Sequence, residues 1–494
     1  MKIGFDKDFY MKKQSQFIIE RIDKFDKLYL EFGGKLLEDF HAGRVLPGFD
    51  INAKIKLLEK LKDKAEIIIP INAKDLERNK IRADYGINYG LSVMHLIDNL
   101  RERDIYVNSV VITQFENQPA AVIYKQKLER LGVKVYLHTK TKGYPTDIET
   151  IISEEGYGKN EFIETTKPLV VVTAPGPGSG KLATCMCQLY HEYKRGVKAG
   201  YAKFETFPIW NIPLKHPVNV AYEAATADLK DVNMIDHFHL EAYGKTCVNY
   251  NRDIEVFPVV RAIMKKLSGG GLEYKSPTDM GVNMAGYAIT DDEVVKKAAC
   301  QEVIRRYFKA LCDYKQGLSD YSPVEKIEFL MSELNLTVAD RPVVAAANEK
   351  AEKEKLAVVS IELGNGEIIT GKSSSLMTAS CAMLLNAIKK LAGINDKIKL
   401  ISPVVIDPIL KLKKNTLKQK DKVLNLEQVL IALSICAATN PVVEAALGKI
   451  NELEGLEAHS SCILGESDED VLKRLKINIS EEPEFYSKEL YYNK

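Results

Sequence analysis

This sequence has little excess charge of one sign, no long apolar run and no cysteine pair at C-x-x-C spacing. Its 494 residues carry 69 Lys and Arg against 68 Asp and Glu, a formal charge of +1. Because a dedicated nucleic-acid binder usually shows a basic excess, we do not expect a nucleic-acid partner. No apolar run reaches the roughly 18 residues that a bilayer-spanning helix needs, so we expect no membrane partner.

The eight cysteines are too sparse for a disulfide framework, and no two of them stand at C-x-x-C spacing. Unpaired thiols fit a reducing compartment, so we expect a cytoplasmic protein. Hydrophobic residues make up 46% of the chain and charged residues 28%, which is ordinary globular composition. This balance excludes a disordered chain, a collagen and a low-complexity scaffold.

The first 180 residues alternate short apolar runs with helical stretches. The apolar runs are the predicted strands 28–32, 65–71, 109–114, 133–137 and 169–173. The predicted helices between and before them are 8–26, 54–63, 91–103 and 119–131. Repeated strand–helix–strand units with nearly continuous apolar strands predict a doubly wound, mostly parallel sheet, whose ligands gather at the carboxyl ends of the strands.

We expect three parts along the chain, at about 150 residues per domain. They are an α/β domain over 1–245, a mainly helical domain over 246–335 and a C-terminal α/β domain over 336–494. In the third part, the Asn365-Gly366 pair predicts a hairpin. The elements that we expect after it are a helix over 374–391, a strand over 398–404, a helix over 425–438 and a strand over 457–464.

The strongest local signal is the segment Val-Val-Val-Thr-Ala-Pro-Gly-Pro-Gly-Ser-Gly-Lys-Leu-Ala-Thr at 170–184, a strand that leads through a glycine loop into a helix. Glycines let main-chain N–H groups approach phosphate oxygens, and the start of a helix adds positive potential. We therefore predict phosphate contacts from Gly176, Gly178, Ser179, Gly180 and Lys181. The P-loop pattern is incomplete, because Pro175 holds the first glycine position and Leu182 replaces the Mg²⁺-binding hydroxyl residue. A tight turn without a ligand is the alternative.

The segment 366–373 matches the same P-loop pattern fully, yet its residues predict a different local structure. The residues between its glycines are Glu, Ile, Ile and Thr, which predict a strand after the Asn-Gly turn. A strand cannot curl around a phosphate. We therefore expect no second nucleotide loop in the third part of the chain.

Acidic residues and histidines concentrate over 228–241. Its candidate metal ligands are Asp228, Asp231, Asp236, His237, His239 and Glu241. The two histidines, two residues apart, face the same side only if the segment is extended. Helix-capping aspartates with interfacial histidines are the alternative account.

Together these signals predict an enzyme, a nucleotide-dependent transferase or hydrolase that binds a small phosphorylated ligand with a nucleotide and Mg²⁺ as cofactors. The predicted catalytic residues are Lys181, Asp228 and Asp236, of which Lys181 would neutralise developing charge and the aspartates would hold the metal. Near another strand end lie the predicted substrate-binding residues Glu31, Lys35, His41 and Arg44. The alternative is a non-catalytic nucleotide or anion sensor, and in both cases we expect a homo-oligomer.

Several phrases resemble the bacterial domain-of-unknown-function family 1846. They include Tyr29-Leu-Glu-Phe-Gly-Gly-Lys35, Ala174-Pro-Gly-Pro-Gly-Ser-Gly-Lys181 and Lys203-Phe-Glu-Thr-Phe-Pro-Ile-Trp210. The resemblance covers essentially the whole chain and implies an N-terminal α/β part, a helical part and a C-terminal α/β part. It implies no activity.

The third part of the chain also resembles a cytidine-deaminase-like α/β layer, with a hairpin followed by a small-residue helix. Zinc deaminases need a His or Cys with a catalytic Glu two residues later, and a later Pro-Cys-x-x-Cys. Here Met383 stands two residues after Cys381, and the late strand offers His459-Ser-Ser-Cys462. We therefore expect no zinc.

Overall fold

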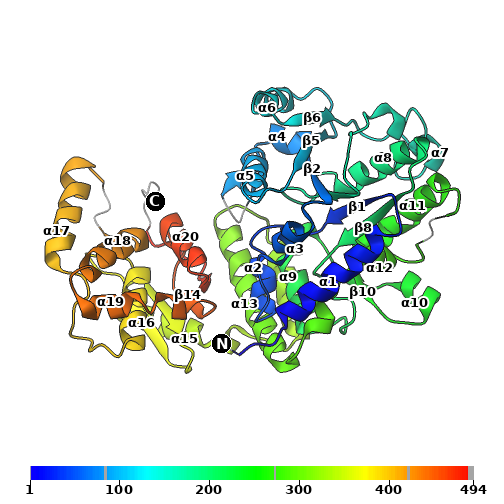
Figure 1. The fold of residues 1–494 in the computed structure, drawn as a ribbon. Helices are drawn as coiled ribbons and strands as arrows, with labels where there is room; N and C mark the ends of the chain where they lie inside the picture. The colour runs from blue at the N-terminus through cyan, green and yellow to red at the C-terminus, as the bar shows by residue number, and fades with distance from the viewer. Residues whose placement is uncertain (1, 83–85, 272–273, 420–422, 488–494) are drawn as a thin grey trace. The chain divides into compact units, whose positions relative to one another are not determined.

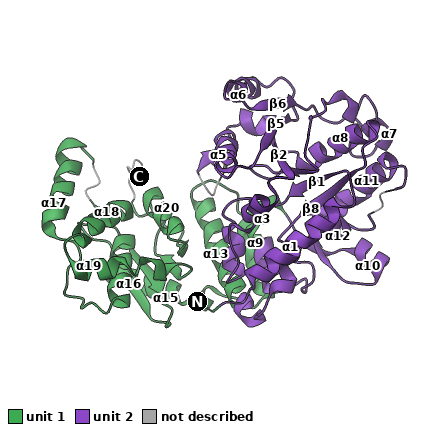
Figure 2. Cartoon of the chain, in the orientation of Figure 1, with its two compact units in different colours: residues 1–2, 224–230, 297–494 green, residues 3–223, 231–296 purple. Residues whose placement is uncertain are grey.

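The computed structural model describes residues 2–82, 86–271, 274–419 and 423–487. Its described residues form two compact units (Figures 1 and 2). We call them the N-terminal unit, residues 3–223 and 231–296, and the C-terminal unit, residues 1–2, 224–230 and 297–494. Each unit is described by itself. No helix among the described residues is long and apolar enough to cross a membrane.

The N-terminal unit contains a seven-stranded sheet in the order β11-β8-β1-β7-β2-β5-β6 over the described residues. All neighbouring strands in it are parallel. The strands are β1 (Lys27–Phe32), β2 (Ala65–Asn72), β5 (Val107–Thr113), β6 (Lys134–Leu137), β7 (Leu169–Val172), β8 (Ala199–Phe204) and β11 (Gly281–Val282). The predicted parallel sheet is confirmed.

Helices cover both faces of this sheet, as a doubly wound fold requires. Alternate strand residues face opposite cores: Leu28 and Leu30 of β1 belong to one core and Tyr29 to the other. The first core takes its helices from α1 (Lys7–Ile22), α3 (Ala53–Leu61), α5 (Tyr89–Arg101) and α6 (Pro119–Arg130). The second takes them from α7 (Ile148–Ile151), α8 (Lys181–Lys194) and α11 (Asn251–Leu267).

The direction of winding changes between β1 and β7, which are neighbours in the sheet. The chain leaves β1 for α3 on one face, whereas it leaves β7 for α8 on the other. The connections therefore diverge at the carboxyl ends of these two strands. Such a switch point is where open α/β sheets bind their ligands.

Shorter elements complete the N-terminal unit. The short helices are α2 (Phe40–Val45), α4 (Ala73–Glu77), α9 (Pro217–Ala225, whose last two residues belong to the C-terminal unit), α10 (His237–Tyr243) and α12 (Pro277–Met280). Two antiparallel strand pairs are β3 (Ile81–Arg82) with β4 (Ile87–Asn88), and β9 (Asn233–Ile235) with β10 (Val248–Tyr250).

The C-terminal unit contains a mixed four-stranded sheet in the order β13-β12-β14-β15 over the described residues. β12 (Val358–Glu362) pairs antiparallel with β13 (Ile368–Lys372) and β14 (Glu457–Ser460), and β14 pairs parallel with β15 (Asn478–Glu481). The helices are α13 (Asp292–Lys315), which begins in the N-terminal unit, α14 (Ser322–Glu333), α15 (Pro342–Glu354), α16 (Ala379–Leu391), α17 (Pro403–Lys411), α18 (Leu426–Ala437), α19 (Pro441–Leu447) and α20 (Glu466–Arg474).

Two expectations for this unit have clear outcomes. The Asn-Gly hairpin is confirmed: Gly366 has φ +84°, and the P-loop-like match at 366–373 lies along strand β13. The strand expected over 398–404 is wrong, because Pro403 begins α17 and the Ser402 side chain caps it. Proline preorganises the first turn of a helix, which overrides the β-branched residues around it.

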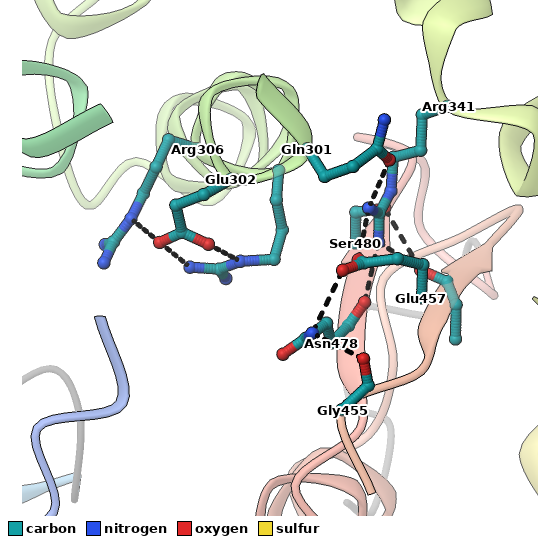
Figure 3. A network of polar contacts seen from close by, with 10 residues as sticks. Gln301, Glu302, Arg306, Arg341, Gly455, Glu457, Asn478 and Ser480 are labelled. Atoms are coloured by element: carbon teal, nitrogen blue, oxygen red, sulfur yellow. Dashed lines mark hydrogen bonds and ion pairs between the residues drawn. The ribbon is translucent and has the colours of Figure 1, made fainter. Parts of the chain in front are cut away.

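One arginine is enclosed at the centre of the C-terminal unit. Arg341 is fully buried, and its guanidinium donates hydrogen bonds to Ser480 Oγ (2.8 Å) and the carbonyls of Ala458 (2.8 Å) and Asn478 (2.7 Å). It also forms a 2.5 Å ion pair with Glu457 (Figure 3). This network ties the start of α15 to β14 and β15.

Candidate functional site

The glycine loop lies at the switch point, between the end of β7 and the start of α8. Gly178 and Gly180 have φ values of +75° and +92°, the left-handed region that glycine adopts without strain. Side chains from neighbouring strand ends hold the loop by its carbonyls. Thr113 Oγ1 donates to the Ser179 carbonyl at 2.8 Å, and Asn72 Nδ2 donates to the Gly178 carbonyl at 3.2 Å.

The main-chain N–H groups of this loop remain available. Within the described ranges, no residue accepts a hydrogen bond from the N–H of Gly178, Ser179, Gly180 or Lys181. Gly180 is the N-cap of α8 and brings no capping side chain. Of these four residues Ser179 is buried, Gly178 is exposed, and Gly180 and Lys181 are partly exposed. The start of a 14-residue helix attracts negative charge. Anion binding at these N–H groups stays a prediction.

A glycine comparison tests the geometry of this loop. A Cβ on residue 180 would stand 2.8 Å from Thr113 Cγ2, whereas one on residue 178 meets nothing within 4 Å. Both positions have positive φ, so Gly178→Ala is expected to lower the free energy of unfolding by about 1–2 kcal/mol through backbone strain alone. We expect Gly180→Ala to cost at least about 1 kcal/mol more in chemical denaturation, because the loop must also move. Equal costs for the two variants would contradict this loop geometry.

Lys181 points its charge toward the end of β1. Its Nζ lies 3.9 Å from Glu31 Oε1, and the other oxygen of this buried carboxylate accepts a 2.9 Å hydrogen bond from the Tyr201 hydroxyl. Burial lowers the pKa of Lys181, the Glu31 carboxylate opposes that shift, and the charge of Lys203 adds to it. The structure thus brings the predicted residues Glu31 and Lys181 together across the switch point.

Beside this pair lies a group of titratable side chains that we call the acid–base cluster: the buried Lys203, Glu205 and Tyr250, and the partly exposed Asp253. Lys203 Nζ is 2.7 Å from Glu205 Oε1 and also contacts Asp253 and the Tyr250 hydroxyl. That hydroxyl donates to the same Glu205 oxygen at 3.1 Å. The cluster joins the end of β8 to β10 and α11.

The carboxylates determine how this cluster is charged. Burial alone would lower the pKa of Lys203, but the carboxylates of Asp253 and Glu205 raise it well above its usual value. Burial raises the pKa of Glu205 to about 7, with Lys203 opposing the shift and Asp253 adding to it. A carboxyl that titrates near neutral pH is suited to proton transfer.

The other predicted substrate residues lie on the connection after β1. Lys35 lies three residues after the end of β1, and His41 and Arg44 lie on α2. The His41 ring stands edge-on to Phe207, with 5.0 Å between ring centroids, and 6.1 Å from the ring of Tyr222. His41 therefore lies on the β8 side of the switch point.

The predicted metal-binding aspartates have separate surroundings. Asp236 is buried and caps α10, accepting hydrogen bonds from the His239 N–H at 3.0 Å and from Thr278 Oγ1 at 2.6 Å. Asp231 forms a 2.6 Å ion pair with Arg252. Asp228 lies in the short helix Ala227–Leu229, which belongs to the C-terminal unit.

The histidine pair of this segment does not adopt the extended arrangement that would align it. His237 and His239 lie on helix α10, so their side chains diverge. Among the residues that the structure describes, no group of three or more His, Cys, Asp or Glu side chains is arranged to hold a metal ion. A Mg²⁺ held partly by a bound nucleotide stays a prediction.

The acid–base cluster was not predicted from the sequence. No strand was predicted between residues 173 and 245, but Ala199–Phe204 is strand β8, paired with β1 and β11. Its alternation was the available signal: Tyr201, Lys203 and Glu205 stand two apart, whereas Ala202 and Phe204 enter the opposite core. No sequence pattern around Tyr250 or Asp253 indicates that these residues join the cluster.

The fold is that of an α/β protein with a doubly wound parallel sheet and a glycine loop at its switch point. Family comparison identifies residues 3–335 as "Domain of unknown function DUF1846, N-terminal" and residues 339–491 as "Domain of unknown function DUF1846, C-terminal". The chain therefore belongs to this family, and the resemblance seen in the sequence is confirmed.

Its relatives are bacterial proteins of the same length class. The chain is 59% identical over 501 residues to a "UPF0371 protein" of Clostridium botulinum and 58% identical over 501 residues to one of Clostridium tetani. It is 58% identical over 505 residues to one of Fusobacterium nucleatum. In each comparison the match covers 100% of both chains.

Proposed function

We propose that this protein is a cytoplasmic enzyme that binds a phosphorylated ligand, a nucleotide, at the loop 174–181. The observation that carries the proposal is the set of N–H groups from Gly178 to Lys181, which lack acceptors among the described residues at the start of α8. The position of this loop at the switch point supports it. Lys181 supplies the cation for the outer phosphates.

The reaction class we propose is nucleotide-dependent transfer or hydrolysis. The acid–base cluster supplies a titratable carboxyl, and Glu31 interacts with both Lys181 and Lys203 of the cluster. On the connection after β1 lie Lys35, His41 and Arg44, which we propose bind the substrate. We further propose a homo-oligomer, and a C-terminal unit related in fold to cytidine deaminases without their zinc chemistry.

A non-catalytic nucleotide or anion sensor is the second candidate. Leu182 favours it, because this residue stands where a P-loop enzyme places the hydroxyl that binds Mg²⁺. A sensor would bind nucleotide with the same loop but would not turn it over. Release of phosphate from ATP by the purified protein, measured with and without Mg²⁺, separates the two candidates.

Binding itself is tested by calorimetry with pyrophosphate, ADP and ATP, followed by a crystal structure with the tightest ligand. We expect phosphate oxygens within hydrogen-bond distance of the N–H groups of Gly178 to Lys181. A bound ligand elsewhere, with these N–H groups facing only water, would contradict the proposal.

Metal analysis tests the expectation that the C-terminal unit carries no zinc. The three zinc candidates are engaged in other contacts: His459 Nδ1 lies 2.9 Å from Ser480 Oγ, and Cys381 and Cys462 are buried. Burial raises the pKa of Cys462 to about 11, which disfavours the thiolate that zinc requires. We expect less than about 0.1 zinc per chain by plasma mass spectrometry. Stoichiometric zinc that is lost in Cys381→Ser would show that this expectation is wrong.

A further inference from the structure

The charged groups at the carboxyl ends of β1 and β8 do not balance. Glu31, Glu205 and Asp253 are three carboxyls, whereas Lys181 and Lys203 are two ammonium groups. The neighbouring Arg252 forms its own ion pair with Asp231. Because an uncompensated charge is costly in a buried site, one carboxyl is expected to hold a proton part of the time.

Glu205 is the carboxyl best placed to hold that proton. Lys203 contacts both Asp253 and Glu205, so one ammonium group serves two carboxylates. Burial raises the pKa of Glu205 to about 7, with Lys203 opposing the shift and Asp253 adding to it. The groups that face Glu205 are Lys203 of β8, Tyr250 of β10, Asp253 of α11, Tyr222 of α9 and, beyond Lys203, Glu31 of β1.

The glycine loop and this carboxyl share a chain of electrostatic contacts. Lys181 interacts with Glu31 and Lys203, and Lys203 interacts with Glu31 and Glu205. A phosphate bound to Lys181 and the loop N–H groups adds negative charge at one end of this chain. The added charge disfavours ionised carboxylates nearby, and Glu205 is the one that can respond near neutral pH.

We propose that Glu205 is the proton-exchanging group of the phosphate site, taking up a proton when a phosphate occupies the glycine loop. This inference rests on the proposed function. In the loaded state a larger fraction of Glu205 is the carboxylic acid, which can donate a hydrogen bond or a proton to the ligand. Since β8 lies two strands from β7, the ligand class is a phosphorylated compound with a second, hydrogen-bond-accepting group roughly 10 Å from its phosphate.

Calorimetry of pyrophosphate binding at pH 7.5, in buffers of different ionisation enthalpy, measures this proton. Raising the pKa of Glu205 from about 7 by half a unit to one unit takes up about 0.3–0.5 proton per site. We expect proton uptake by Glu205→Gln to be smaller than that of the wild-type protein by this amount. The protons that pyrophosphate itself exchanges are the same for both proteins and cancel in the difference. Glu481→Gln is the matched control, because burial also raises the pKa of Glu481 to about 7, in the C-terminal unit.

A second variant keeps the test independent of the folding of Glu205→Gln. Tyr250→Phe removes a hydrogen bond that favours ionised Glu205, so its pKa rises and the pH of maximal proton uptake moves upward. Uptake unchanged in both variants would overturn the role of Glu205 and leave the phosphate site standing. Wild-type protein that binds no pyrophosphate would overturn the proposed function itself.

Discussion

Replacing Lys181 with alanine is expected to lower the affinity for pyrophosphate at least about tenfold. A charge-assisted hydrogen bond contributes about 1.5–3 kcal/mol, which corresponds to roughly 10–150-fold in Kd. Glu31 would still accept the hydrogen bond from Tyr201, so we expect Tm to fall by no more than about 3 °C. Calorimetry and thermal unfolding of the same preparation measure both effects.

Lys194→Ala is the matched control for this variant. Lys194 lies at the other end of α8, in an exposed ion pair with Glu154, so its removal should change neither affinity nor stability measurably. Unchanged affinity in Lys181→Ala would move the phosphate site elsewhere. A fall in Tm of about 10 °C would show that the main role of Lys181 is to stabilise the packing of the fold.

The largest effect on stability is expected from Arg341→Met. Methionine keeps much of the stem volume but removes every hydrogen bond of the guanidinium, leaving Ser480 Oγ and two carbonyls without this donor. Breaking a buried ionic network by removing one partner costs about 3–5 kcal/mol. At about 2–4 °C per kcal/mol, Tm should fall by about 6 °C or more in differential scanning calorimetry.

Arg474→Met is its control. Arg474 lies exposed at the end of α20, in the same unit, so we expect a change within about 0.5 kcal/mol. If the two variants unfolded at the same temperature, the network in Figure 3 would not stabilise the unit.

The strands that the sequence predicted well are those buried on both faces. The expected runs 28–32, 65–71, 109–114 and 169–173 correspond to β1, β2, β5 and β7 within two residues. Such strands read as apolar throughout, so local composition is enough to find them. β8 was missed because Gly200 and Lys203 interrupt its apolar pattern, and its strand character comes from pairing with β1 and β11.

The sequence by itself determined the doubly wound sheet, the hairpin at Gly366 and the place of the glycine loop. These follow from apolar periodicity and from the backbone freedom of glycine, which act over a few neighbouring residues. Only the tertiary structure decided that Lys203 and Glu205 meet Tyr250 and Asp253, from segments almost 50 residues away. Burial and the competition of two carboxylates for one ammonium group change the pKa of Glu205, and neither property exists until the chain has folded.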